Sequence, residues 1–160
     1  MPTVVFVCTK NQFRSPLAEV MLKDMLATRN ISGDWIVESV GSWVEKLSPA
    51  TYEAVIEAKK RGLDLRSHTA KSIENINHDQ IDLLLVMEAG QKEAIQLEYP
   101  SLKKKTFLLS ELSGTPYSIP DPYLTSEPCS EIALEIEQLV QSNIDTIIRL
   151  ALGISHCAKD

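Results

Sequence analysis

Apolar and polar positions form a pattern along this chain that predicts four strands alternating with helices. Strands are expected where short, continuous apolar runs are rich in β-branched residues, as in strands that are buried on both faces. Helices are expected where apolar residues recur about once per turn. The predicted strands cover residues 4–7, 35–40, 81–87 and 106–109. The predicted helices cover residues 16–29, 49–61, 88–97 and 128–152, with a short helix beginning near residue 71.

Repeated strand–helix alternation implies a parallel sheet with helices on both faces. We therefore expect α/β architecture over residues 1–160: a single-domain, three-layer sandwich of the flavodoxin or Rossmann type, with a four-stranded parallel sheet. In such sheets, ligands bind beyond the carboxyl ends of the strands. Cys8 stands at such an end, directly after the first predicted strand.

The polar loop between the first strand and the first helix carries a thiol and a guanidinium, with five residues between them. A loop that feeds a helix N-terminus can direct several backbone N–H groups at an anion, and the helix dipole reinforces them. Arg14 adds a planar fork of donors that suits two oxygens of a phosphate. The same groups favour the thiolate form of Cys8. The loop thus predicts a nucleophile beneath a phosphate cradle.

Composition narrows the function classes. The chain has 160 residues and a net charge of −6, which argues against a nucleic-acid partner. It has no apolar run near the roughly 20 residues of a membrane span, and its N-terminus does not resemble a signal peptide. We therefore expect a cytoplasmic protein that does not bind membranes. The basic run at residues 103–105 is either a solvated loop or a patch that attracts an acidic phosphoprotein.

Three cysteines provide neither an even disulfide framework nor the close pairing of a structural zinc site. We expect no metal ion and no cofactor. Cys129 and Cys157 are expected to be inert helix residues. Cys8 alone has surroundings that predict reactivity.

A long loop rich in Gly and Pro, residues 110–125, carries Asp121. Long loops inside compact domains are usually functional. Asp-Pro is also a common start of a turn, so Asp121 alone could be structural. Beside Cys8 and Arg14, however, a carboxylic acid would serve to protonate a departing phenolate or alkoxide.

Two motifs carry a resemblance to a known family. Cys8-x5-Arg14-Ser15-Pro16, placed directly after an apolar strand, and the later Asp121-Pro122-Tyr123 resemble the low-molecular-weight protein tyrosine phosphatases. Fainter similarity extends over nearly the whole chain. The resemblance implies a metal-independent phosphomonoesterase, a protein tyrosine phosphatase that acts through a Cys8 thiophosphate. Arg14 would bind the phosphate, and Asp121 would be the general acid and base. The implied substrate is a phosphotyrosine-containing protein or a small aryl phosphate, with inorganic phosphate as the product.

The resemblance also assigns supporting roles. Asn11 would hold a left-handed turn and hydrogen-bond to Ser15, Ser39 and His68. Ser15 would also stabilise the thiolate as a leaving group. The alternatives are a helix cap for Ser15 and ordinary surface positions for the other two. The expected substrate-binding residues are Thr9, Lys10, Asn11, Gln12, Phe13 and Ser15, with Trp43 and Tyr123 as aromatic walls unless those two pack into the core.

Three positions depart from the family pattern. Lys10 stands where the family usually has Gly, Phe13 replaces a second cysteine, and Leu124 replaces the second of two tyrosines. Lys10 motivates one alternative function, a weakly active module that binds phosphate or a phosphoprotein. The other alternative is an arsenate reductase. Thioredoxin-coupled reductases of this type carry two further cysteines before the Asp-Pro loop, whereas this chain has none between Cys8 and Cys129.

Overall fold

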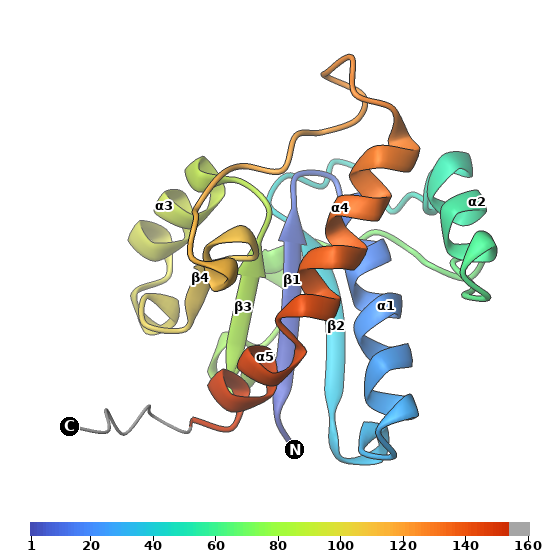
Figure 1. Ribbon diagram of the computed structural model, residues 1–160. Coiled ribbons are helices and arrows are strands. Elements are labelled where there is room, and N and C mark those ends of the chain that lie inside the picture. The colour runs from blue at the N-terminus through green and yellow to red at the C-terminus, as the bar shows by residue number, and fades with distance from the viewer. Residues whose placement is uncertain (154–160) are drawn as a thin grey trace.

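Four short strands form one parallel sheet in the computed structural model, which describes residues 1–153 (Figure 1). The strand order is β2-β1-β3-β4, so the first strand lies inside the sheet, between β2 and β3. The four-stranded parallel sheet predicted from the sequence is confirmed. The strands are β1 (Thr3–Cys8), β2 (Ile36–Gly41), β3 (Leu83–Val86) and β4 (Thr106–Leu108).

Residues 1–153 also contain five α-helices and five short 3₁₀ turns. The helices are α1 (Arg14–Thr28), α2 (Tyr52–Lys60), α3 (Ala89–Glu98), α4 (Cys129–Ser142) and α5 (Ile144–Ala151). The 3₁₀ turns cover Ser32–Asp34, Ile73–Asn75, His78–Gln80, Pro100–Leu102 and Ser110–Ser113. The short helix expected near residue 71 is the second of these turns. Among residues 1–153, no helix has both the length and the apolar character needed to cross a membrane.

The sheet separates two hydrophobic clusters because successive strand residues point to opposite faces. Val4, Phe6 and Cys8 pack into the larger cluster, which α1, α4 and α5 cover. Val5 and Val7 pack into the smaller cluster, which includes Ile95 of α3. This arrangement is the expected three-layer sandwich, and it buries β1 completely on both faces.

Helix α1 begins at Arg14, two residues earlier than it would if Ser15 were its cap. Phe13 occupies the N-cap position and makes no side-chain capping hydrogen bond. Ser15 lies inside the first turn, where its hydroxyl contacts Cys8 and Asn11 instead. The alternative role of Ser15 as the cap of this helix is therefore wrong, because its hydroxyl makes tertiary contacts in the loop instead.

Two other helix boundaries differ from the predictions. Helix α2 starts at Tyr52 because Thr51 is its cap and accepts a hydrogen bond from the Ala54 amide. The predicted final helix is interrupted at Asn143, although its apolar stripe continues on both sides. The Asn143 amide donates to the Leu139 carbonyl and to the Ser113 hydroxyl, each at 2.8 Å, which ties the break to a distant turn. Cys157, expected in a helix, lies outside the described residues.

Candidate active site

Residues 8–14, here called the cysteine loop, connect the end of β1 to the start of α1. Cys8 is 2% exposed, at the carboxyl end of an inner strand of the sheet. Its Sγ lies 3.0 Å from the Ser15 Oγ. When Cys8 is a thiolate, the Ser15 hydroxyl is the hydrogen-bond donor of this pair, because a thiolate has no proton to give. The loop therefore places a hydroxyl within hydrogen-bond distance of a buried thiol.

Asn11 organises the inside of the cysteine loop. It is fully buried and adopts the left-handed conformation, with φ of 57°. Its side-chain amide donates to the hydroxyls of Ser15 and Ser39 at 2.8 and 2.9 Å. Its side-chain oxygen accepts from the Lys71 amide at 3.0 Å, and its backbone carbonyl lies 2.8 Å from His68 Nε2. The hydrogen bonds expected among these residues are present, so the turn is held from several elements.

The Arg14 guanidinium is 2% exposed and is oriented from several sides. Its Nη1 donates to the Ile119 carbonyl at 2.8 Å and lies 3.3 Å from a Glu88 carboxylate oxygen. Its Nη2 donates to the Thr9 hydroxyl at 3.4 Å and lies 3.8 Å from Asp121 Oδ2. These contacts come from three separate segments of the chain. They fix the plane of the guanidinium, which bidentate recognition of a phosphate requires.

Glu88 and Gln91 belong to this arrangement, although no motif in the sequence marked them. Both lie at the start of α3, directly after β3, which pairs with β1. The Gln91 amide nitrogen donates to the Thr9 hydroxyl at 2.9 Å and to the Glu88 carboxylate at 3.0 Å. Their position directly after a predicted strand could have indicated them, because polar residues that follow a parallel strand lie at the same edge of the sheet as Cys8.

Asp121 reaches the same edge from the loop of residues 114–128, here called the Asp121 loop. Ile119 anchors this loop to the end of β3, since its amide donates to the Met87 carbonyl at 2.8 Å. The Asp121 side chain is 14% exposed, and its Oδ1 accepts from the Tyr123 amide at 2.9 Å. The other oxygen faces Arg14, as described above. The structure thus brings together the thiol, the guanidinium and the carboxyl group that the sequence motifs predicted.

Tyr123 connects the Asp121 loop to two other parts of the molecule. Its hydroxyl donates to a Glu53 carboxylate oxygen at 2.8 Å, and its ring packs edge-on against Phe13 with the centroids 6.1 Å apart. Burial raises the pKa of Tyr123, and the nearby Glu53 carboxylate raises it further, while a hydrogen bond with Thr51 lowers it. Phe13 is 3% exposed, so only its backbone is available to a ligand.

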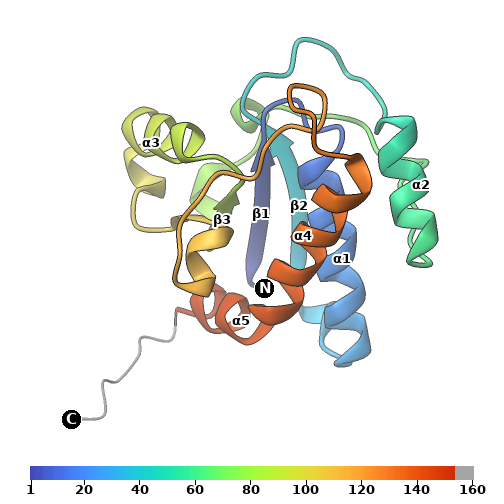
Figure 2. The ribbon, with the colours of Figure 1, turned by 45° about the horizontal axis from the view of Figure 1, so that its top comes forward.

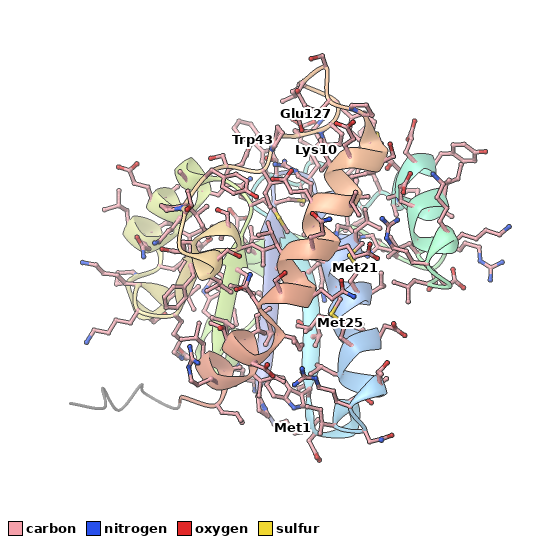
Figure 3. The ribbon with its side chains drawn as sticks, in the orientation of Figure 1. Met1, Lys10, Met21, Met25, Trp43 and Glu127 are labelled. Carbon is pink, nitrogen blue, oxygen red and sulfur yellow. The ribbon has the colours of Figure 1, made fainter. Side chains whose placement is uncertain are left out.

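The remaining predicted residues lie at the rim. Trp43 is 69% exposed on the loop after β2, so it does not pack into the core. Lys10 is exposed and Gln12 is half-buried. Figure 3 shows Lys10 and Trp43 at the end of the molecule where β1 terminates. The rim therefore exposes an aromatic ring and an ammonium group near the buried side chains of Cys8 and Arg14.

The other cysteine in the described part of the chain lies beside Tyr123 and Glu53. Cys129 is the first residue of α4, and burial, reinforced by the negative charge of Glu53, raises the pKa of its thiol. Within residues 1–153, no group of three or more His, Cys, Asp or Glu side chains is arranged to hold a metal ion.

A parallel α/β sheet with a buried cysteine at the end of an inner strand, next to a helix N-terminus and a fixed arginine, defines a class of proteins that hold an oxyanion over a thiol. The chain belongs to the low molecular weight phosphotyrosine protein phosphatase family, whose model matches residues 3–150. The family membership predicted from the two motifs is confirmed.

Individual relatives agree with this family. A low molecular weight protein-tyrosine-phosphatase, Ptp, of Acinetobacter johnsonii is 32% identical over 75% of this chain and 79% of its own. A protein-arginine-phosphatase of Geobacillus stearothermophilus is 30% identical over 92% of this chain and 93% of its own. An arsenate reductase 2 of Staphylococcus epidermidis is 32% identical over 72% of this chain and 82% of its own. The crystal structure of the low molecular weight protein tyrosine phosphatase from T. tengcongensis superposes with a TM-score of 0.82 at 31% identity, covering 91% of this chain and 99% of that one.

Proposed function

We propose that this protein hydrolyses phosphotyrosine in proteins, and small aryl phosphates, through a thiophosphate formed on Cys8. The observation that carries the proposal is the convergence of three side chains at one sheet edge. The Cys8 thiol lies against Ser15, Arg14 is held rigidly by its neighbours, and the Asp121 carboxyl group faces that guanidinium at 3.8 Å. Each group has the chemistry that one part of phosphate ester hydrolysis requires.

The first step transfers the phosphoryl group to sulfur. Arg14 and the backbone N–H groups of the cysteine loop bind the non-bridging oxygens, where charge must be stabilised in the transition state. The Cys8 thiolate forms a bond to phosphorus while the bond from phosphorus to the ester oxygen breaks. Asp121, protonated at this stage, gives its proton to the departing oxygen, so the phenol leaves as a neutral molecule.

The second step returns the enzyme to its starting state. Asp121, now a carboxylate, takes a proton from a water molecule that attacks phosphorus. The sulfur–phosphorus bond breaks, inorganic phosphate forms, and the electron pair returns to Cys8. The Ser15 hydroxyl, 3.0 Å from the sulfur, stabilises the thiolate that leaves. Neither step requires a metal ion or a cofactor.

The substrate and the cellular location form the finer part of this proposal. The exposed ring of Trp43 and the ring of Tyr123 flank the mouth of the site and suit a phosphorylated aromatic side chain. We propose a phosphotyrosine-containing protein as the partner, with no role for nucleic acid or membranes. The cytoplasm is the compartment that we propose for this activity.

Protein phosphoarginine is the second candidate substrate, favoured by the arginine phosphatase relative. The Glu88 carboxylate beside Arg14 is 32% exposed, so it can accept hydrogen bonds from a substrate guanidinium. Arsenate reduction has the support of one relative, but the sequence lacks the pair of cysteines between Cys8 and Cys129 that would relay a disulfide outward. A binding module is disfavoured, because Cys8, Arg14 and Asp121 are all in place.

The deciding experiment measures product release from three substrates in the presence of a chelator. We expect phosphate release from a phosphotyrosine peptide, with slower release from a phosphoarginine peptide and no thiol-dependent reduction of arsenate. Cys8→Ser should abolish turnover while retaining vanadate binding, and Cys129→Ser is the matched control that should keep full activity. A strict need for a divalent cation, or turnover by the Cys8→Ser variant, would overturn the mechanism. Faster hydrolysis of phosphoarginine would replace the proposed substrate.

A further inference from the structure

The loop of residues 42–51 leaves a cavity beside the cysteine loop. Near one end of the loop, the Trp43 amide donates to the Thr9 carbonyl at 2.9 Å. At its other end, the Thr51 amide donates to the Gln12 carbonyl at 3.0 Å. Between these two points the chain arches away, as Figure 2 shows between the end of β2 and the start of α2. The space beneath the arch therefore opens directly beside the cysteine loop.

The arch is also braced from its outer side, so the cavity is formed without a ligand. The Ala70 amide donates to the Ser48 carbonyl at 2.7 Å, and Pro49 forms an isolated antiparallel bridge with Thr69. At the base of the arch, a Cβ on Gly41 would lie 2.6 Å from the Thr9 carbonyl oxygen. Only glycine permits this close approach of the two loops.

The cavity has a volume of about 380 Å³ and an excess of positive charge. Lys10 and Lys46 line it together with one carboxylate, Glu45, and the exposed ring of Trp43. Among residues 1–153, no carboxylate lies within 4 Å of either lysine ammonium group. Both ammonium groups are therefore available to a ligand, although the protein as a whole has a net charge of −6.

A second cavity on the other side of Trp43 has the opposite character. It has a volume of about 560 Å³, shares Thr9 and Trp43 with the first, and is lined by three carboxylates. These are Glu74, Glu88 and Glu98. An anionic group of a bound substrate would be repelled there and attracted to the lysine side. The mouth of the site is therefore positively charged on the side of Lys10 and Lys46 and negatively charged on the side of the three glutamates.

We propose that the cavity between Lys10 and Lys46 binds a carboxylate side chain of the substrate protein, close in sequence to the phosphorylated residue. This inference rests on the proposed phosphatase function and specifies its substrate class as acidic phosphoprotein segments. Lys10 follows Cys8 by two residues, so the cavity adjoins the phosphate site. An extended peptide advances about 3.3 Å per residue, which places a neighbouring Asp or Glu within reach.

The expected effect is modest, because both lysines are exposed and salt screens them. An exposed ion pair is worth about 0.2–1 kcal/mol, which corresponds to a preference of roughly 1.4- to 5-fold for each lysine. The preference should appear mainly in KM and in the rate of association, and it should shrink as the ionic strength rises.

The test uses three phosphotyrosine peptides that differ only in the residues flanking the phosphotyrosine, which are Glu, Gln or Lys. For the wild-type protein at low salt, we expect kcat/KM to fall in the order Glu, Gln, Lys. Lys46→Gln should reduce the Glu-over-Gln ratio about threefold, and the Lys10→Gln/Lys46→Gln double variant should abolish the preference. Lys104→Gln, on the turn before β4, changes the net charge equally and is the matched control.

Binding of the same peptides to the Cys8→Ser variant, followed by fluorescence anisotropy, separates this inference from the proposed function. If no peptide is hydrolysed, the proposed function fails, and the order of affinities alone decides whether the carboxylate subsite exists. Equal affinities for the Glu and Gln peptides would overturn the subsite, as would a preference for the Lys peptide. A Glu preference that survives the double variant, or that Lys104→Gln removes as well, would also overturn it.

Discussion

The cysteine loop and the Asp121 loop supply the two halves of one site, yet they are held in place in different ways. In the cysteine loop, Asn11 alone makes hydrogen bonds to Ser15, Ser39, Lys71 and His68. The Asp121 loop is largely exposed, and hydrogen bonds hold it at Tyr117, Ser118 and Ile119 on one side of Asp121 and at Tyr123 on the other. The loop that carries Cys8 and Arg14 is thus held through buried groups, whereas the Asp121 carboxyl group is carried by an exposed segment that is fixed on either side of it.

This difference has a physical basis. Electrostatic stabilisation of a phosphoryl group requires donors that do not reorganise during the reaction, and a dense network of buried hydrogen bonds provides that rigidity. A segment with few buried contacts opens at a lower free-energy cost than the core does. Substitutions in the cysteine loop should therefore affect every substrate, while those in the Asp121 loop should depend on the leaving group.

The largest effect is expected for Arg14→Lys. A single ammonium cannot donate to the Ile119 carbonyl and also present two parallel donors to a phosphate. We expect kcat/KM to fall by about 10² to 10³ for every substrate, whatever its leaving group. Steady-state kinetics with a series of aryl phosphates measures this, and a thermal melt checks the fold. A loss confined to poor leaving groups would contradict the assignment of Arg14 to phosphate binding.

Asp121→Asn should divide substrates by leaving group. Phosphotyrosine needs a proton on its departing oxygen, so its turnover should fall by roughly 10² or more. An acidic phenol departs without help, so formation of the thiophosphate should be nearly unaffected. Hydrolysis of that intermediate loses its base, and a burst of released phenol should appear in stopped-flow traces. Equal slowing of both substrates without a burst would make Asp121 a turn residue only.

Asn11→Ala should reduce both activity and stability. Two hydroxyls and one amide lose a buried partner, and alanine is strained at φ of 57°. We expect the free energy of unfolding to fall by about 2 kcal/mol or more, and kcat/KM to fall about tenfold for all substrates. Denaturant unfolding provides the measurement.

Asn11→Gly serves as the companion variant, because it relieves the strain and still loses the hydrogen bonds. Its stability should lie between those of the wild type and Asn11→Ala. If Asn11→Gly matched the wild type in stability, the hydrogen bonds of Asn11 would contribute nothing measurable.

The smallest effect is expected for Tyr123→Phe, which removes the hydrogen bond to Glu53 and keeps the ring against Phe13. One net hydrogen bond near the surface is worth about 0.5–1.5 kcal/mol, so phosphotyrosine turnover should fall by about twofold to tenfold at most. Aryl phosphates with acidic phenols should be unaffected. Tyr117→Phe is the matched control, since burial and a hydrogen bond to Glu135 raise the pKa of Tyr117 to about 12 on the same loop.

The raised pKa of Tyr123 also sets the pH range of its contribution to stability. A folded pKa above the usual value of 10 means that the hydroxyl stays protonated longer in the folded state. Its stabilisation is complete below pH 10 and is lost only as the pH rises through the raised value. The difference in stability between the wild type and Tyr123→Phe should therefore be constant up to about pH 9. A difference that disappeared in the neutral range would contradict the hydrogen bond to Glu53.

The sequence predicted the parts of this molecule that local patterns encode. The four apolar runs became the four strands, and the spacing of Cys8 and Arg14 marked the loop that joins β1 to α1. What it did not reveal depends on contacts between distant segments. The helix is interrupted at Asn143, whose side chain donates a hydrogen bond to the Ser113 hydroxyl. The apolar stripe continues on both sides of Asn143 and therefore does not predict this interruption.

The prediction of the site was limited in the same way, since it found residues within local motifs and missed residues from distant segments. Motifs identified Cys8, Arg14 and Asp121, which lie together in the structure, whereas Glu88 and Gln91, which contact Arg14 and Thr9, were missed. Their roles follow from the pairing of β3 with β1, which only the assembled sheet makes visible. A sequence motif can identify groups that lie within one loop, because the number of residues between them is fixed. Supporting groups that follow a neighbouring strand have no fixed distance in sequence from that loop.

The arch of residues 42–51 is joined to the cysteine loop through main-chain atoms at both Trp43 and Thr51. Hydrogen bonds between backbone groups do not depend on which side chains the residues carry, apart from proline. The side chains between these two points can therefore change during evolution, or in a designed library, while the nucleophile keeps its position. We therefore expect the contribution of the arch to substrate preference to change by mutation without loss of the catalytic loop, whereas Lys10 belongs to that loop and is less free to change.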